Sequence, residues 1–119
     1  MHSSIGLRAV VVAGALLVLG AACAVESPSA PLGADGQPDA VLDAGRTIYS
    51  ARCARCHGGD GAGGTGPKLS EGAVVAKFPE FDDQVTIIRN GKNGMPSFAG
   101  ALSDEQIEAV TRYTREVLR

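Results

Sequence analysis

Tryptophan is absent from this chain of 119 residues, which also has only three phenylalanines and two tyrosines. Aromatic side chains therefore bury little area, and a domain of this size is marginally stable unless something else reinforces its core. An excess of one charge sign is lacking too, because 11 lysines and arginines stand against 13 aspartates and glutamates, for a net charge of −2. Without a basic stripe, the composition gives nucleic-acid binding no electrostatic support.

Side chains that bind metals or carry out redox chemistry are also few: two histidines, three cysteines and two methionines. One of each lies within the first 25 residues. The others are His57, Cys53, Cys56 and Met95. A zinc site needs about four ligands, and an iron–sulfur cluster needs about four cysteines or two cysteines with two histidines, so this inventory excludes both.

The first 25 residues have the composition of an export signal, with a weakly basic start, a long uncharged run and small residues after it. Cleavage by a lipoprotein peptidase falls before Cys23, although Gly20 stands where such sites usually have leucine. Cleavage by an ordinary signal peptidase falls after Ala24. An uncleaved anchor is the third alternative, because the run is barely long enough to span a bilayer. We predict a lipoprotein-type signal peptide over residues 1–23, because lipidation gives the odd cysteine a role.

The segment that follows, residues 24–38, is rich in proline, serine, glycine and aspartate. Such a composition cannot build a core and predicts a flexible tether. Residues 39–119 then form the one folded domain. The predicted location is extracytoplasmic, in the periplasm or on the outer face of the cytoplasmic membrane, with the domain anchored to the membrane through Cys23.

Residues 53–57 form a C-x-x-C-H motif. Two cysteines three positions apart on one turn of backbone put both thiols on one side, where they can add to two vinyl groups at one porphyrin edge. The histidine directly after them falls under the ring, where its imidazole can reach the iron. The motif indicates a covalently attached c-type haem held by Cys53 and Cys56, with His57 as an axial ligand. A dithiol redox pair or a disulfide between the two cysteines is the alternative.

A glycine-rich segment, residues 61–66, matches G-x-G-x-x-G. That pattern is typical of dinucleotide binding when it follows a strand and opens a helix. Here it follows the cysteine motif and leads into Pro67. We therefore predict a loop around one edge of the haem and no phosphate site.

Apolar periodicity and capping residues predict three main helices, over residues 40–55, from Asp82 or Asp83 to residue 90, and over residues 103–118. Asp82 is the expected cap of the second helix. The third begins with a capping box formed by Ser103 and Gln106.

From residue 39 onward the chain resembles the small bacterial monohaem cytochromes c of class I. The resemblance is carried, in order, by residues 45–49, 53–58, 66–69, 94–98 and 102–106, with Tyr113 in the last helix. It covers nearly the whole domain. It implies an all-α cytochrome c fold in which three main helices surround one covalent haem c, and in which Gly45 lets the last helix approach the first.

Met95 is the candidate for the second axial position. It is the one methionine beyond the start, and it lies between Gly94 and Pro96 in a predicted loop, not in a helical apolar stripe. Histidine and methionine ligate the iron in cytochromes c; the alternative is a space-filling Met95 beside an open iron. The resemblance further implies that the carbonyl of Pro67 binds the far nitrogen of the His57 imidazole, the alternative being a proline that stiffens the loop.

Two filled axial positions leave the iron no site for a substrate, so we predict a one-electron carrier and no enzyme. The expected partners are redox proteins: respiratory membrane complexes, with a dehydrogenase or bc-type complex as donor and an oxidase or reductase as acceptor. Two alternatives remain open. One is a cytochrome subunit of a periplasmic dehydrogenase complex, and the other is a sensor or peroxidase-like protein with an open iron.

Overall fold

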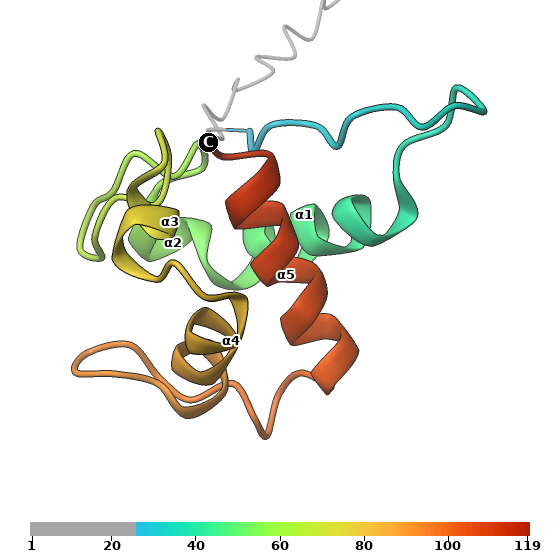
Figure 1. The fold of residues 1–119 in the computed structure, drawn as a ribbon. Helices are drawn as coiled ribbons and strands as arrows, with labels where there is room; N and C mark the ends of the chain where they lie inside the picture. The colour runs from blue at the N-terminus through green and yellow to red at the C-terminus, as the bar shows by residue number, and fades with distance from the viewer. Residues whose placement is uncertain (1–25) are drawn as a thin grey trace, which may run out of the picture.

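The computed structural model describes residues 26–119 (Figure 1). The predicted signal peptide and the lipidation of Cys23 fall outside the described residues and stay predictions, as does the domain boundary at residue 39. The described part of the chain has five helices and no strand, and none of these helices is long and apolar enough to cross a membrane. The helices are α1 (Ala40–Arg52), α2 (Ala54–His57), α3 (Ala73–Lys77), α4 (Phe81–Asn90) and α5 (Asp104–Glu116). The predicted all-α fold class is confirmed.

Helix α1 begins at a cap made by Asp39. Its carboxylate accepts hydrogen bonds from the backbone N–H groups of Val41 at 3.0 Å and Leu42 at 2.9 Å. These N–H groups have no acceptor inside the helix, so the cap satisfies them. The prediction of one continuous helix over residues 40–55 is wrong, because the backbone leaves the regular helix at Cys53 (φ −111°) and resumes as the single turn α2 (Ala54–His57).

The last two helices lie close to their predicted ranges. Ser103 and Gln106 form the predicted capping box at the start of α5. Helix α4 ends at Gly91, whose φ of 76° favours glycine. The expected cap at Asp82 is wrong: α4 begins one residue earlier, at Phe81, and no side chain caps it. The short helix α3 was absent from the prediction, because five residues carry too little periodicity to indicate a helix.

Helices α1 and α5 cross at Gly45 (Figure 1). A Cβ atom at Gly45 would collide with the backbone carbonyl of Ala109 and would lie 2.8 Å from the Cβ of Tyr113. The close approach that the resemblance implied is therefore present. Beside the crossing, the fully buried rings of Tyr49 and Tyr113 lie with their centroids 5.5 Å apart. Both rings belong to the buried core cluster, and they join the first helix of the domain to the last.

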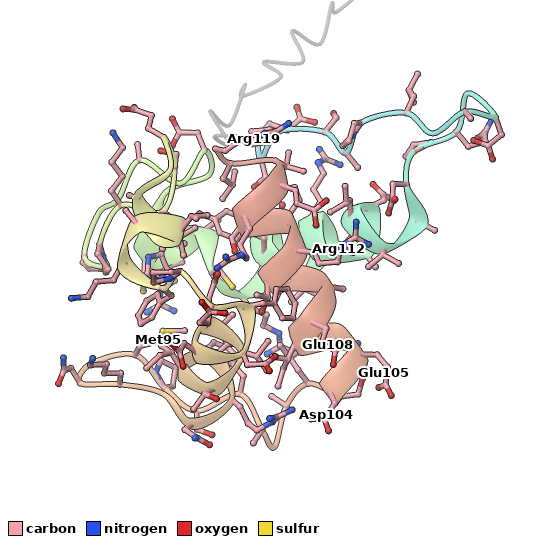
Figure 2. All side chains as sticks on the ribbon, in the orientation of Figure 1. Met95, Asp104, Glu105, Glu108, Arg112 and Arg119 are labelled. Atoms are coloured by element: carbon pink, nitrogen blue, oxygen red, sulfur yellow. The ribbon has the colours of Figure 1, made fainter. Side chains whose placement is uncertain are left out.

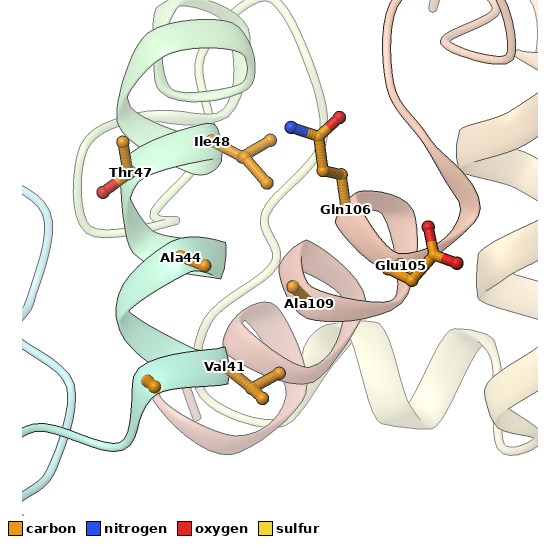
Figure 3. A pocket seen from close by; sticks show the side chains of 8 residues that line it. Val41, Ala44, Thr47, Ile48, Glu105, Gln106 and Ala109 are labelled. Carbon is orange, nitrogen blue, oxygen red and sulfur yellow. The ribbon is translucent and has the colours of Figure 1, made fainter.

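A shallow groove of about 480 Å³ runs along the crossing of α1 and α5 (Figure 3). Its lining residues are Ala40, Val41, Ala44, Thr47, Ile48, Glu105, Gln106 and Ala109. None of them is a cysteine, histidine or methionine. The groove therefore lacks the ligand types that the sequence singles out.

The first described residues, 26–30, form a strap across α1 and α5. Arg46 Nε donates to the carbonyl oxygen of Ser27 at 2.9 Å, and the Tyr113 hydroxyl donates to that of Pro28 at 2.7 Å. Two side chains of the strap are buried. The segment predicted to be a flexible tether thus packs on α1 and α5 through its first described residues, which its composition did not indicate.

Candidate functional site

One large cleft opens between α2, α3, α4 and α5 and the loops that join them (Figure 2). Its volume is about 1110 Å³, slightly larger than the range of about 300–1,000 Å³ typical of ligand pockets. The predicted site residues that line it are Cys53, Cys56, His57, Pro67 and Met95. The fold therefore brings together side chains that the sequence places far apart.

Cys53 lies directly before the single turn of α2, and Cys56 lies within that turn. The backbone N–H groups of Cys56 and His57 both donate to the carbonyl oxygen of Cys53, at 3.0 Å each. Both thiols are free, so the alternative of a disulfide between them is not what the structure has. Burial, and then the neighbouring Cys56 sulfur, raise the pKa of the Cys53 thiol to about 11. At neutral pH it is a protonated thiol.

The imidazole of His57 is 8% exposed and is held by one hydrogen bond. Its Nδ1 lies 2.8 Å from the carbonyl oxygen of Pro67. Because a carbonyl only accepts, Nδ1 carries a proton, and in the neutral imidazole Nε2 therefore keeps the lone pair. Among residues 26–119, Nε2 has no hydrogen-bond partner. The contact that the resemblance implied for Pro67 is present, and it leaves the imidazole in the tautomer that binds a metal.

Gly66 makes room for this imidazole. A Cβ atom at Gly66 would lie 2.8 Å from His57 Cε1 and 2.9 Å from Nδ1. The loop that carries it folds back on α2, because Gly66 N–H donates to the Cys56 carbonyl at 2.8 Å. Within the described residues no strand precedes this loop, so it lacks the context of a dinucleotide site.

Tyr49 supports the same turn from α1. Its hydroxyl donates to the carbonyl oxygen of Gly58 at 2.6 Å, directly after His57. Burial raises the pKa of Tyr49 well above its ordinary value, so the phenol stays a donor. Tyr49 is part of the sequence resemblance, but this bond was not predicted, because its partner is a backbone atom that no side-chain pattern reveals.

Met95 reaches the cleft from the loop after α4. Its backbone pairs with Lys92, through N–H···O bonds of 3.1 and 3.0 Å. A Cβ at Gly91 would lie 2.6 Å from the Met95 carbonyl oxygen, so the glycine permits this tight turn. The Met95 side chain is half-buried and packs against the core (Figure 2). The predicted loop at Met95 is confirmed, and it delivers the side chain to the cleft that His57 lines.

Helices α4 and α5 contribute a buried polar pair to the lining of the cleft, which the sequence did not reveal. Gln84 Nε2 donates to Thr114 Oγ1 at 2.7 Å, and both residues line the cleft. Val110 contributes an apolar surface from α5. Of the three phenylalanines, Phe78 and Phe98 line the cleft. An apolar cleft with a few fixed polar groups suits a large, flat, mainly apolar ligand.

The described residues fit a covalent haem. Two free thiols on one turn, an imidazole with an available nitrogen and a thioether share one apolar cleft. By contrast, residues 26–119 contain no group of three or more His, Cys, Asp or Glu side chains placed to hold a metal ion directly. This donor set fits a metal that is carried by a porphyrin better than a metal ion held by protein side chains alone.

The fold and the cleft define a small all-α protein with one covalently bound redox cofactor. The family described as cytochrome c oxidase, cbb3-type, subunit III matches residues 40–113. Cytochrome c6 from Pyropia tenera is 41% identical over 76 residues, covering 62% of this chain and 89% of the relative. Cytochrome c6 from Synechococcus elongatus is 37% identical, covering 62% and 87%.

Solved structures agree. Cytochrome c6 from the diatom Phaeodactylum tricornutum is 35% identical, with a TM-score of 0.54, covering 61% of this chain and 88% of that one. Cytochrome c6C from Synechococcus sp. PCC 7002 is 31% identical, with a TM-score of 0.54, covering 62% and 93%. The chain belongs to the cytochrome c family. It is a monohaem electron carrier whose cofactor is haem c, as predicted.

Proposed function

We propose that Cys53 and Cys56 hold the haem through thioethers, that His57 Nε2 and Met95 Sδ occupy the two axial positions, and that the protein carries electrons in an extracytoplasmic respiratory chain. The observation that carries the ligand assignment is the hydrogen bond between His57 Nδ1 and the Pro67 carbonyl at 2.8 Å. It leaves one nitrogen lone pair free in the cleft that Met95 lines.

The protein's own residues fix the site on both sides. Pro67 orients the imidazole, Gly66 leaves it room, and the turn at Gly91 presents the Met95 thioether. The apolar lining keeps water away, which limits the change in solvation when the charge of the site changes. The bound haem supplies an iron that cycles between Fe(III) and Fe(II), taking up or releasing one electron. With two protein ligands on the iron, no substrate site remains, so we expect no catalytic turnover of its own.

Replacement of Met95 tests the axial assignment. Met95→Ala removes the thioether and Met95→Leu removes it while keeping most of the volume, which separates loss of the sulfur from loss of packing. Both variants should bind carbon monoxide and have a lower reduction potential, because a methionine ligand raises it. Potentiometric titration and carbon monoxide difference spectra measure both. An unchanged potential and no carbon monoxide binding in either variant would reject Met95 as the ligand and favour the space-filling alternative.

The location and the anchor are tested by the mass of the mature protein. A chain that begins at Cys23 with a diacylglyceryl group has a different mass from one that begins after Ala24 or keeps its signal sequence. The haem adds to all three. Cys23→Ser is the matched control, because it removes the lipidation site and leaves the ordinary cleavage site in place. A lipid-free mass for the unmodified protein would exclude the lipoprotein proposal.

The partners follow from the location. We expect a dehydrogenase or bc-type complex as donor and an oxidase or reductase as acceptor, because a carrier with no substrate site must exchange electrons with other redox proteins. Co-purification with a periplasmic dehydrogenase at fixed stoichiometry would favour the alternative of a dedicated subunit. Recovery as a separate protein, which the donor complex reduces and the acceptor complex oxidises, would support a mobile or tethered carrier.

A further inference from the structure

The two asparagines of the chain, Asn90 and Asn93, are each followed by a glycine. An asparagine in this position is chemically labile, because the next backbone nitrogen can attack its side-chain carbonyl and glycine has no Cβ to obstruct the attack. Both asparagines are exposed. Whether either one reacts therefore depends on how the fold holds the nitrogen of the glycine that follows it.

The structure treats these two glycine nitrogens differently. Asn90 is the last residue of α4, and the Gly91 N–H donates to the Ile87 carbonyl at 2.8 Å. An attack on Asn90 therefore requires that the end of the helix opens first. The Gly94 N–H has no hydrogen-bond acceptor within residues 26–119. It lies in the loop after α4, which projects from the body of the domain (Figure 1).

Aspartate in front of glycine can close the same ring, and residues 35–36 and 60–61 are two such pairs. In both pairs the glycine N–H donates to a backbone carbonyl, at 3.0 and 3.2 Å. Both aspartate carboxylates also accept a backbone N–H at 3.0 Å. Of the four places in residues 26–119 where asparagine or aspartate precedes glycine, only residues 93–94 leave the glycine nitrogen without a hydrogen bond.

The backbone at Asn93 also has the shape that ring closure needs. Lys92 and Met95 exchange N–H···O bonds of 3.1 and 3.0 Å, so Asn93 and Gly94 are the central residues of a hairpin turn. The φ of Asn93 is 54° and that of Gly94 is not positive, which is the pattern of a type II′ turn. In such turns the first central residue has a ψ of about −120°. A five-membered ring through Cβ, Cγ and the next nitrogen imposes nearly the same ψ, because it brings Cβ and that nitrogen close to eclipsed about the Cα–C bond.

We infer that Asn93 is a site of spontaneous deamidation and isomerisation, and that the fold protects the other three pairs. The Gly94 nitrogen bonds to Asn93 Cγ, the bond from Cγ to the side-chain nitrogen breaks, and ammonia leaves with the proton of the Gly94 N–H. Water then opens the cyclic imide at either of its carbonyls. The product is aspartate or isoaspartate at position 93, and water is the one co-reactant.

Isoaspartate would lengthen the turn that presents Met95. In this product the main chain runs through the former side-chain Cβ, so an additional atom separates Lys92 from Gly94. A two-residue turn cannot accommodate that atom and keep both hydrogen bonds between Lys92 and Met95. The consequence for the iron rests on the proposed function, because it requires that Met95 is the axial ligand. The isoaspartyl form should then hold the thioether on the iron less firmly.

Ageing of the folded holoprotein in mildly alkaline buffer tests the site. A protease specific for arginine releases residues 90–112, which contain both asparagines. Electron-transfer fragmentation of this peptide locates the new carboxyl group and distinguishes isoaspartate from aspartate. Modification at Asn93 should be roughly tenfold faster or more than at Asn90, because Asn90 reacts only after a local opening. In urea the two rates should converge. Equal rates in the folded protein, or reaction of Asn93 in urea alone, would overturn the inference.

Substitutions around the turn test the chemistry. A Cβ at Gly94 meets no atom within 4 Å, so Gly94→Ala leaves the fold intact while its methyl group hinders attack by the nitrogen. It should slow the modification of Asn93. Asn93→Gln should abolish it, because the six-membered ring closes far more slowly. Asn90→Gln is the matched control and should leave the rate at Asn93 unchanged. An unaltered rate in Gly94→Ala would reject attack by the Gly94 nitrogen.

The modified protein carries an additional negative charge, so anion exchange enriches it. Asn93→Asp is its matched control, because this variant has the same charge on a backbone of normal length. Hydrogen exchange at the N–H groups of Lys92 and Met95 should be faster in the aged protein than in Asn93→Asp, whether or not Met95 binds the iron. Unchanged exchange would overturn the lengthening of the turn.

The iron supplies the last readout. A lower reduction potential and carbon monoxide binding in the aged protein, and not in Asn93→Asp, would support the effect of isoaspartate on the ligand. Faster exchange at Lys92 and Met95 with an unchanged potential would instead reject Met95 as the axial ligand, while the modification site at Asn93 would stand. The failure of this inference and the failure of the proposed function therefore give different results.

Discussion

The Nδ1 atom of His57 lies 2.8 Å from the carbonyl oxygen of Pro67, and Gly66 occupies the position directly beside this contact. The hydrogen bond determines which nitrogen faces the cleft. The glycine determines whether the ring can stay there, because any side chain would overlap it. Two neighbouring residues of one loop, Gly66 and Pro67, thus control the orientation of an imidazole that lies on a separate helix.

Gly66→Ala should therefore disturb the site. The added methyl group would lie 2.8 Å from His57 Cε1, so the imidazole must move or the loop must withdraw with Pro67. We expect a loss of about 1–3 kcal/mol in the free energy of unfolding, as for other overpacked positions, and a changed reduction potential. Urea titration and potentiometry measure the two effects.

Gly100→Ala is the matched control for that experiment. A Cβ at Gly100 meets no atom within 4 Å, and its φ is not positive. It should alter stability by no more than about 0.5 kcal/mol and leave the potential unchanged. If Gly66→Ala behaves like Gly100→Ala, the close packing of Gly66 does not constrain the His57 imidazole.

The features that the sequence predicted well are local ones. The turn of residues 53–57 and the capping box of Ser103 each depend on a few consecutive residues, whose geometry sequence and stereochemistry largely determine. Met95 was found by elimination, because the chain offers so few alternatives. Scarcity of ligand types made the candidate site more predictable than most of the fold.

The features that the sequence did not predict depend on contacts between distant residues, or on segments too short to show periodicity. The strap at residues 26–30 is held by Arg46 and Tyr113, and composition alone cannot show that a polar segment docks on a helix pair. The buried Gln84 lies on α4, and its bond to Thr114 exists only once α4 and α5 are packed. Tertiary packing, which local patterns do not encode, decides both.

Gly45→Ala tests the crossing of α1 and α5. Alanine favours a helix by about 1 kcal/mol relative to glycine, so an uncrowded position would gain stability. Here the methyl group would collide with the backbone of Ala109, which cannot rotate away. We expect a net loss of about 1–3 kcal/mol in urea titrations followed by circular dichroism. Ala44→Gly, at an exposed neighbouring position, measures the helix propensity alone. A stabilised Gly45→Ala variant would show that the helices do not pack closely there.

The two tyrosines should titrate abnormally. Burial raises the pKa of Tyr113 to about 12 and that of Tyr49 above its ordinary value of 10.0. A folded-state pKa above the unfolded one means that the neutral phenol is stabilised by folding. Its contribution to stability is complete below about pH 10 and is lost as the pH rises through about 12. NMR of ring-labelled tyrosine should show no ionisation near pH 10 in the folded protein and normal ionisation in urea. Normal titration of either ring in the folded protein would contradict its burial.

Tyr113→Phe tests what holds the strap at residues 26–30. The variant keeps the buried ring and removes the hydroxyl that donates to the Pro28 carbonyl at 2.7 Å. We expect a loss of about 0.5–1.5 kcal/mol and faster hydrogen–deuterium exchange in peptides that span residues 26–39. Tyr49→Phe is the matched control, because its hydroxyl donates to Gly58 instead. It should leave exchange in the strap unchanged and accelerate it in residues 56–60. Equal exchange in the strap of both variants would show that Arg46 and the buried side chains, and not the Tyr113 hydroxyl, fix the strap to the helices.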